Sequence, residues 1–210
     1  MKYIIMCGGE YAEPIPKQLF KVNGEELTAR TIRLLKQEGI DDISISSNNP
    51  VFDKFGIPRL EHVNTFGVAE DGELKGLWVD AFYPLDEPAC YVFGDVLFSD
   101  KAIHKIVTTE TNDVEFFASA PPFGPGYPKP WAEPFAFKVV NQEHFREAIE
   151  KTKELKEQGK FVRHPISWEL WQVIKNTPIN CIDFSNYTAI NDYTCDIDHE
   201  NQIAQWRIKI

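Results

Sequence analysis

Two stretches of the sequence combine a hydrophobic run with residue types suited to phosphate and metal chemistry. In the first, residues 2–7 form a short apolar run that predicts a buried strand, and Gly8 and Gly9 follow directly. Glycines let the backbone turn sharply and present bare N–H groups, because they carry no Cβ. Lys17 follows a few residues later. Backbone amides and an ammonium group that converge would bind the anionic oxygens of a phosphorylated ligand.

The second stretch lies in the middle of the chain. Residues 89–93 are all of types found in buried strands, and they run into Gly94 and Asp95. At the carboxyl end of a central parallel strand, Asp95 would lie where open α/β sheets bind their ligands. Mg²⁺ at phosphoryl-transfer sites takes one or two carboxylates and completes its shell with phosphate and water. Asp95 is therefore a candidate metal ligand, with a helix-capping or turn role as the alternative.

The elements that must position these residues alternate between strand and helix patterns. Residues 25–38 carry an apolar stripe at helical spacing, and residues 41–47 then predict a second strand. Strand, helix and strand within about fifty residues predict a βαβ unit with parallel strands and a right-handed crossover. Further helices are expected at residues 74–83, 99–107, 141–159 and 168–174, the last with Ser167 as its N-cap, and further strands at 57–63, 112–120 and 180–184.

The motifs and their order resemble those of the GT-A-like nucleotidyltransferases of the sugar-phosphate and cytidylyl types. The resemblance covers nearly the whole chain, although each motif is short. The family has a glycine-rich turn with a Pro-Lys-x-Leu, then a Gly-Asp-x-x-Phe, a Glu-Pro and a closing acidic strand. The residues that match these motifs, in that order, are Gly8-Gly9 with Pro16-Lys17-Gln18-Leu19, Gly94-Asp95 with Phe98, Glu133-Pro134, and Asp196 with Asp198.

The resemblance implies roles for these residues. In the family, the glycine loop wraps a nucleoside triphosphate, the lysine contacts its phosphates and aspartates hold Mg²⁺. Lys17 and Asp95 would then be catalytic, and Asp95 and Asp198 would be metal ligands. Asp196 is the second candidate at the C-terminal strand, since alternate residues of a strand share one face. The implied nucleotide-binding residues are Met6, Cys7, Gly8, Gly9, Lys17, Gly76 and Gly94.

The acceptor side is expected in residues 121–139. Residues 121–130 contain five prolines and two glycines, which exclude a helix and favour a rigid flap over a pocket, with a surface linker as the alternative. The resemblance implies Trp131 and Glu133 as acceptor-binding residues, and Lys129 could meet an acceptor phosphate. An aromatic wall with one acid would also suit a cationic group on the acceptor.

The sequence departs from the family at the glycine loop. The family usually carries an arginine there that grips the triphosphate, whereas this loop has none and contains Glu10 and Glu13. Either another cation substitutes, such as Arg30 or one from a distant loop, or nucleotide binding is weakened.

Composition limits the class of protein. The net charge of −10 argues against nucleic acid as a partner, because its binders concentrate Lys and Arg. No apolar run approaches the length of a membrane span, and the N-terminus lacks the pattern of a signal peptide. The four cysteines are scattered, and Cys7 and Cys90 lie in expected strands, which is typical of buried thiols in a cytoplasmic protein.

We therefore expect a single α/β domain over residues 1–210. Its fold would be Rossmann-like and of the GT-A type, with a central, mostly parallel sheet, helices on both faces and a small antiparallel lobe from the 121–139 region. The expected activity joins a nucleoside triphosphate, CTP first, to a small phosphorylated acceptor and releases pyrophosphate. A nucleotide-binding protein without turnover is the main alternative. A GT-A glycosyltransferase is disfavoured, because the segment after Gly94 lacks a second aspartate. The oligomeric state stays open, a homodimer included.

Overall fold

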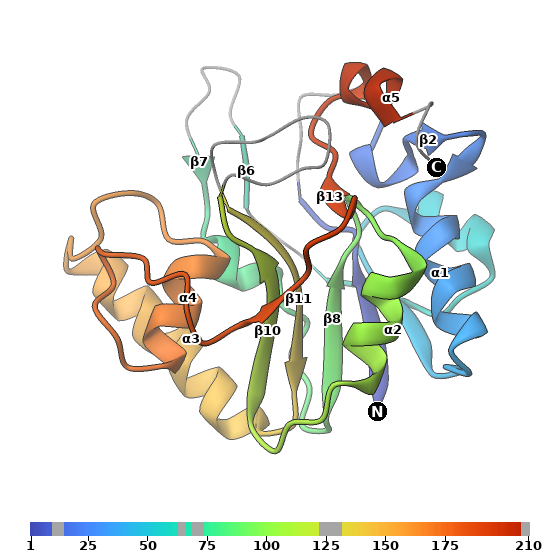
Figure 1. Ribbon diagram of the computed structural model, residues 1–210. Coiled ribbons are helices and arrows are strands. Elements are labelled where there is room, and N and C mark those ends of the chain that lie inside the picture. Colours follow the sequence, from blue (N-terminus) through green and yellow to red (C-terminus); the bar gives the residue numbers. More distant parts are fainter. Residues whose placement is uncertain (10–14, 63–65, 69–73, 122–131, 207–210) are drawn as a thin grey trace.

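A seven-stranded sheet forms the centre of the computed structural model, which describes residues 1–9, 15–62, 66–68, 74–121 and 132–206 (Figure 1). The strand order is β12-β10-β11-β8-β1-β4-β5. Strand β11 is antiparallel to both of its neighbours, and the other pairings are parallel. The strands are β1 (Lys2–Met6), β4 (Ile43–Ser46), β5 (Arg59–Leu60), β8 (Ala89–Phe93), β10 (Val114–Ser119), β11 (Glu133–Val139) and β12 (Thr188–Ala189). The predicted α/β class with a mostly parallel sheet is confirmed.

Helices flank this sheet on both sides, and Figure 1 shows α1 and α2 on one side and α3 and α4 on the other. The helices are α1 (Leu27–Gln37), α2 (Asp100–Thr108), α3 (Gln142–Glu157), α4 (Ser167–Ile174) and α5 (Glu200–Trp206). Three 3₁₀ turns are η1 (Lys17–Leu19), η2 (Pro50–Phe55) and η3 (Trp78–Ala81). Three two-stranded antiparallel sheets pair β2 (Lys21–Val22) with β3 (Glu25–Glu26), β6 (Gly67–Val68) with β7 (Leu74–Lys75), and β9 (Val96–Leu97) with β13 (Cys195–Asp196).

Aromatic side chains fill the space between the sheet and helices α3 and α4. Phe116 of β10 stacks on Phe137 of β11 with ring centroids 4.5 Å apart, and it meets Trp168 of α4 edge-on at 4.9 Å. Phe137 also contacts Phe145 of α3 and Trp171 of α4. Such contacts bury large apolar areas in preferred geometries, so they fix α3 and α4 against the sheet.

A β-bulge in β11 changes which residues face each side of the sheet. Phe117 pairs with Ala136 and Ala118 pairs with Pro134, so Phe135 is the extra residue. Phe135 and Phe137 would share a face in a regular strand, but Phe135 contacts Phe98, just before α2, whereas Phe137 contacts α3 and α4. The bulge therefore redirects the residues at the start of β11.

The expected helix at residues 74–83 is wrong. Leu74 and Lys75 pair with β6, Gly76 adopts a left-handed backbone with φ +64°, and a short 3₁₀ turn, η3, follows. The apolar residues of this stretch pack against aromatic side chains of the core, although they form no α-helix. Trp78 contacts Phe93, and Phe82 contacts Tyr91 and Phe145.

Three further expectations are corrected. Residues 180–184 form no strand, because the Asp183 carboxylate accepts hydrogen bonds from the backbone N–H and hydroxyl of Ser185 and so closes a local turn. Ser167 is the first residue of α4, and Ile166 is its N-cap. Small antiparallel sheets are present as expected, but not from the 121–139 region: its described residues 132–139 contribute β11 to the main sheet.

Among the residues that the structure describes, every helix is too short or too polar to cross a lipid bilayer.

Gly94 marks the closest approach between β8 and β1. A Cβ at this position would lie 2.5 Å from the Met6 carbonyl oxygen and 2.7 Å from Cys7 Sγ. We therefore expect Gly94→Ala to lower the free energy of unfolding by about 1–3 kcal/mol, because the backbone of β1 cannot yield freely. Urea denaturation of the two proteins measures the difference. Equal unfolding curves would contradict this close approach.

Candidate active site

Three residues that are distant in the sequence meet at the carboxyl ends of β1 and β8. The ammonium nitrogen of Lys17 lies 2.6 Å from Asp95 Oδ2 and 3.1 Å from Asp198 Oδ1. The side chains of Lys17, Asp95 and Asp198 are 11%, 20% and 40% exposed. One ammonium group thus holds two carboxylates close together in a partly enclosed place. The structure thus brings together three residues that the sequence analysis proposes for the site.

Backbone pairing brings Asp95 next to the C-terminal acidic segment. The N–H of Gly94 donates to the Met6 carbonyl (3.0 Å), which extends the contact between β8 and β1 past the end of the strands. Beyond this point β9 pairs with β13, and the N–H of Ile197 donates to the Asp95 carbonyl (2.8 Å). Main-chain bonds therefore place the backbone of Asp95 beside the segment that carries Asp198, and the contacts with Lys17 then hold the two carboxylates together.

The oxygen donors of this cluster fit Mg²⁺. Within the described ranges, no group of three or more His, Cys, Asp or Glu side chains is placed to hold a metal. Mg²⁺ at phosphoryl-transfer sites needs only one or two carboxylates, since phosphates and water complete its octahedral shell. Asp95 and Asp198 supply two such carboxylates, and the Lys17 ammonium contacts both of them where a metal ion would bind. Asp196 lines the adjacent pocket.

A pocket of about 360 Å³ opens beside the cluster. Its polar lining comes from the glycine turn, η1, the end of β8 and β13, and its apolar wall from β6, η3 and the start of β11 and α4. The lining residues are Met6, Gly8, Lys17, Gln18, Phe66, Trp78, Ala81, Phe93, Asp95, Ala132, Pro134, Ile166, Ser167 and Asp196. Five residues proposed from the sequence, Met6, Gly8, Lys17, Asp95 and Asp196, thus border one pocket.

Other residues that the sequence proposed for nucleotide binding lie behind or beside this pocket. The Cys7 N–H donates to the Ser46 carbonyl, and its carbonyl accepts from the Ser47 hydroxyl. The Cys7 thiol is buried beside Thr28, and burial raises its pKa. Gly94 serves the close approach of two strands described above. These two residues have evident packing roles.

The remaining glycines differ in their backbone. Gly9 has φ +109° and Gly76 has φ +64°, conformations that L side chains rarely adopt. Gly9 continues the turn from Gly8, which lines the pocket. Gly76 is exposed in the turn between β7 and η3 and is not among the lining residues.

Glu133 lies behind the C-terminal acidic segment and not in the pocket lining. It is almost fully buried, and its Oε2 accepts a hydrogen bond from the Asp196 N–H at 3.2 Å. Its neighbours Ala132 and Pro134 line the pocket instead. The bulge at Phe135 explains this arrangement, because it turns Glu133 towards β13. The other two expected acceptor residues, Lys129 and Trp131, lie outside the described residues, as do Glu10 and Glu13.

Arg30, the expected substitute for the missing loop arginine, is engaged elsewhere. Its Nε donates to the Phe98 carbonyl at 2.8 Å, and one terminal nitrogen donates to the Tyr193 hydroxyl at 3.1 Å. Its guanidinium also lies 3.7 Å from carboxylate oxygens of Glu25 and Asp100. Arg30 therefore ties α1 to the segments around α2 and β13, and it is not among the residues that line the pocket.

The sequence analysis missed the aromatic and α4 walls of the pocket. Trp78 and Phe93 meet edge-on with ring centroids 5.5 Å apart, and Phe66 lies on the same pocket. Phe93 ends a recognised strand, so it could have been found. Trp78 was hidden by the helical interpretation of its segment, and Phe66 carries no local pattern. Ser167 had been assigned to capping.

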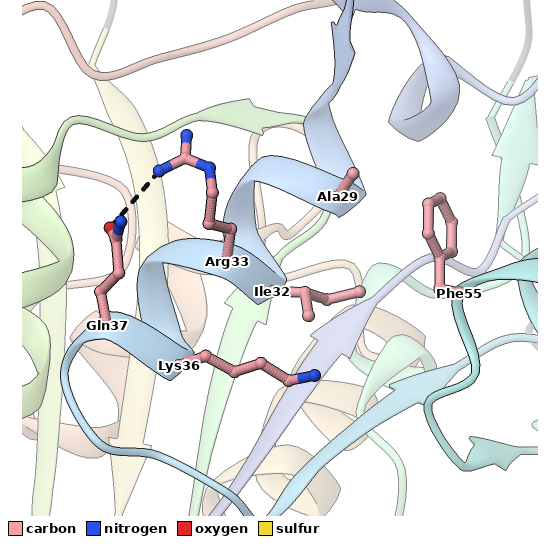
Figure 2. Close-up of a pocket in the computed structure, with 6 residues that line it drawn as sticks. All are labelled: Ala29, Ile32, Arg33, Lys36, Gln37 and Phe55. Atoms are coloured by element: carbon pink, nitrogen blue, oxygen red, sulfur yellow. Dashed lines mark hydrogen bonds between the residues drawn. The ribbon is translucent and has the colours of Figure 1, made fainter.

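Two other pockets lack this combination of groups. Figure 2 shows one on the outer side of α1, where Arg33 donates to Gln37 and Phe55 faces the helix; its lining includes no carboxylate. The other, of about 410 Å³, lies between η3 and α3. Its charged groups pair with one another or with nearby backbone, as Lys153 does with Asp80. Lys153 also contacts Glu150, so this pocket too has a lysine between two carboxylates, but Glu150 is 67% exposed. The pocket beside Lys17 differs because its charged groups are more buried and lie at the carboxyl ends of β1 and β8.

No protein-family model matches the sequence, and no curated protein matches it significantly. Solved structures do match over nearly their whole length. One is a protein of Bacillus anthracis described as a glucose-1-phosphate thymidylyltransferase, with a TM-score of 0.57 and 18% identity over 100% of this chain and 96% of that one. The inositol-1-phosphate CTP transferase of T. maritima gives 0.53 and 13% over 100% and 96%. The CTP:phosphocholine cytidylyltransferase of Streptococcus pneumoniae gives 0.52 and 13% over 99% of both chains. This chain therefore has the Rossmann-like fold of these nucleotidyltransferases.

The hydrogen bond from the Asp196 N–H to Glu133 predicts a measurable local effect. In Glu133→Ala, we expect the Asp196 amide to exchange about tenfold faster or more, because the bond to a charged acceptor is lost. Hydrogen exchange followed by NMR measures this rate. Glu133→Gln keeps an acceptor oxygen and is the matched control, for which a smaller increase is expected. An unchanged rate in Glu133→Ala would contradict the bracing of β13 by Glu133.

Proposed function

We propose that this chain is a nucleotidyltransferase that joins a nucleoside triphosphate, CTP first, to the phosphate of a small acceptor and releases pyrophosphate. The observation that carries the proposal is the contact of Lys17 with both Asp95 and Asp198 beside a pocket. Two carboxylates at strand ends can hold Mg²⁺, and the metal and Lys17 together would supply the positive charge that phosphates require. The fold shared with known nucleotidyltransferases supports it.

The proposed reaction needs few side chains. An oxygen of the acceptor phosphate attacks the α-phosphorus, a new P–O bond forms, and the bond from the α-phosphorus to the bridging oxygen breaks. Pyrophosphate leaves with that electron pair. The attacking oxygen is already an anion, so no general base is required. Catalysis then depends on positioning and on charge neutralisation, which are large contributions in phosphoryl transfer.

Lys17 and the glycine turn would bind the triphosphate. The turn at Gly8 and Gly9 follows the end of β1 directly and offers backbone amides on the pocket side. The Lys17 ammonium lies beside the pocket and would donate hydrogen bonds to phosphate oxygens of the bound nucleotide. Its partial burial excludes water and strengthens that interaction.

Asp95 and Asp198 would hold Mg²⁺, with Asp196 as the second candidate for the C-terminal ligand. When bound, the metal would supply positive charge to the phosphates during bond exchange. The carboxylates are arranged for this by the pairing of β9 with β13 and by the Ile197 hydrogen bond to Asp95. A prearranged site avoids the cost of reordering charged groups during the reaction.

Several finer features belong to the same proposal. Two of the similar proteins named above are CTP transferases, which supports CTP as the nucleotide. Lys129 and Trp131 remain proposed acceptor contacts from the family resemblance, and we now assign Glu133 a positioning role at β13. The aromatic wall of Phe66, Trp78 and Phe93 would contact the base or the acceptor. The net charge of −10 disfavours nucleic acid as a substrate, because proteins that bind its phosphate backbone concentrate Lys and Arg. It therefore supports small-molecule substrates.

Cellular location and assembly are also part of the proposal. Cys7 and Cys90 are free and buried, and Cys181 is free and exposed. Free thiols fit a reducing compartment such as the cytoplasm, which supports the proposed cytoplasmic location. A homodimer remains open.

The alternative of a nucleotide-binding protein without turnover is favoured by one observation. The described lining of the pocket contains Lys17 as its single cationic side chain, and Arg30 is held elsewhere. A site with little positive charge could bind a nucleotide and fail to stabilise the transition state. Turnover measurements separate the two functions.

The test is pyrophosphate release with Mg²⁺, each of four nucleoside triphosphates and a panel of phosphorylated small molecules. Asp95→Ala is expected to lower turnover by about a hundredfold or more, because a metal ligand at the reacting phosphate is lost. Asp42→Ala is the matched control, since Asp42 also pairs with a lysine, Lys2, at 2.8 Å, but just before β4 at the opposite end of the sheet. It should keep full turnover.

Three results would contradict the proposal in different ways. Nucleotide binding in calorimetry together with no release from any pair would favour the alternative without turnover. The absence of any nucleotide binding in the presence of Mg²⁺ would leave only the fold. Equal loss of activity in Asp95→Ala and Asp42→Ala would show that Asp95 has no special role.

A further inference from the structure

The N-terminal end of α4 forms part of the pocket wall. Ile166, the N-cap of α4, and Ser167, its first residue, both line the pocket that Lys17 and Asp95 border. Contacts of Trp168 and Trp171 with Phe116 hold the helix against the sheet, so this end of α4 has a fixed position. Any ligand in the pocket therefore faces the start of a helix.

The hydroxyl group of Ser167 has no hydrogen-bond partner among the described residues. Ser167 is fully buried, and no hydrogen-bonding group of the described chain reaches its Oγ. A buried polar group without a hydrogen bond costs free energy, so a fold keeps one rarely and usually for a reason. Ser119, Trp168 and Trp171 also have a buried polar atom without a partner in the described residues, but of these four only Ser167 lines the pocket, where a ligand atom would complete its bond.

The backbone of the first turn adds further donors. The N–H groups of the first residues of a helix have no acceptor inside the helix. Here the Ile166 N–H donates to the Glu169 carboxylate at 3.0 Å, but Ile166 has no polar side chain with which to cap the following amides. The N–H groups of Ser167 and Trp168 therefore have no acceptor within the described residues. The charge of Glu169 is offset by Arg163, which donates to its carboxylate.

The acceptor phosphate needs such donors. Lys17 is the single cationic side chain in the described lining, and it already contacts two carboxylates. A phosphate monoester carries up to two negative charges, and Mg²⁺ and Lys17 are expected to serve the triphosphate. Helix N-termini bind phosphate groups through their free amides and their dipole.

We propose that the Ser167 hydroxyl and the first-turn amides of α4 bind the phosphate group of the acceptor. The inference rests on the proposed function and assigns the acceptor as a phosphate monoester held from the α4 side of the pocket. Lys17 and the glycine turn bind the triphosphate from the other side of the pocket, at the end of β1. The two phosphates then meet between α4 and the end of β8, with the reacting oxygen directed at the α-phosphorus.

The test uses inorganic phosphate as a probe, with no nucleotide present. Its dissociation constant is measured by ³¹P NMR for the unaltered protein, Ser167→Ala and Ser119→Ala. Ser119 is a matched control, since it too is fully buried with a hydroxyl that lacks a partner, but it lies at the end of β10 and is not in the pocket lining. We expect Ser167→Ala to weaken phosphate binding about tenfold or more, and Ser119→Ala to leave it unchanged.

A second readout separates this inference from the proposed function. With an active nucleotide–acceptor pair, Ser167→Ala should raise KM for the acceptor about tenfold and leave KM for the nucleoside triphosphate unchanged. The Tm of Ser167→Ala should be unchanged or slightly higher, because removal of an unsatisfied hydroxyl does not destabilise the fold. The phosphate titration needs no turnover, so it decides the role of Ser167 even if no transferase activity is found.

The inference is overturned if the unaltered protein does not bind phosphate. It is also overturned if Ser167→Ala binds phosphate as tightly as the unaltered protein, or if both serine variants lose binding equally. If Ser167→Ala weakened phosphate binding only because it destabilised the fold, its Tm would fall below that of the unaltered protein, and this result would also overturn the inference.

Discussion

The electrostatic contact among Lys17, Asp95 and Asp198 is the constraint on which the rest of the site depends. Two carboxylates in a partly buried place repel each other, and a cation between them offsets this repulsion. Such an ion pair adds little to stability, because desolvation of the charges offsets much of their attraction. The fold nevertheless spends three separate elements, η1, the end of β8 and the segment after β13, on bringing these groups together. The arrangement supports the proposal that the cluster binds charged ligands.

The backbone around the cluster is built for precision. Gly94 allows β8 to approach β1 more closely than any side chain permits, and β9 then pairs with β13 to fix Asp95 beside the acidic segment. The Glu133 carboxylate accepts a hydrogen bond from the Asp196 N–H and so stabilises the same segment. The apolar pocket wall comes from different elements, with Trp78 on η3 and Ser167 on α4. Main-chain bonds thus hold the charged side of the pocket, and aromatic packing holds the other side.

Much of this could be predicted from the sequence, because the decisive signals are local. Buried strands that end in Gly8-Gly9 and Gly94-Asp95 predict site residues at the carboxyl ends of the strands. The βαβ order predicts the parallel sheet. The rest depends on tertiary contacts. The bulge at Phe135 moves Glu133 from the expected acceptor pocket to β13, and aromatic packing turns residues 74–83 into a strand and a 3₁₀ turn. Neither effect leaves a periodic pattern, and the missing partner of Ser167 is visible only in three dimensions.

The most direct measurement is the crystal structure of the protein with CTP and Mn²⁺, a stand-in for Mg²⁺ that prefers the same oxygen ligands. Anomalous scattering locates the metal without assumptions about the ligands. The account predicts a metal peak between Asp95 and Asp198, with the triphosphate at Gly8 and Gly9 and the Lys17 ammonium moved onto phosphate oxygens. A nucleotide bound in another pocket, or a Lys17 that keeps both carboxylates while the nucleotide is bound, would contradict it.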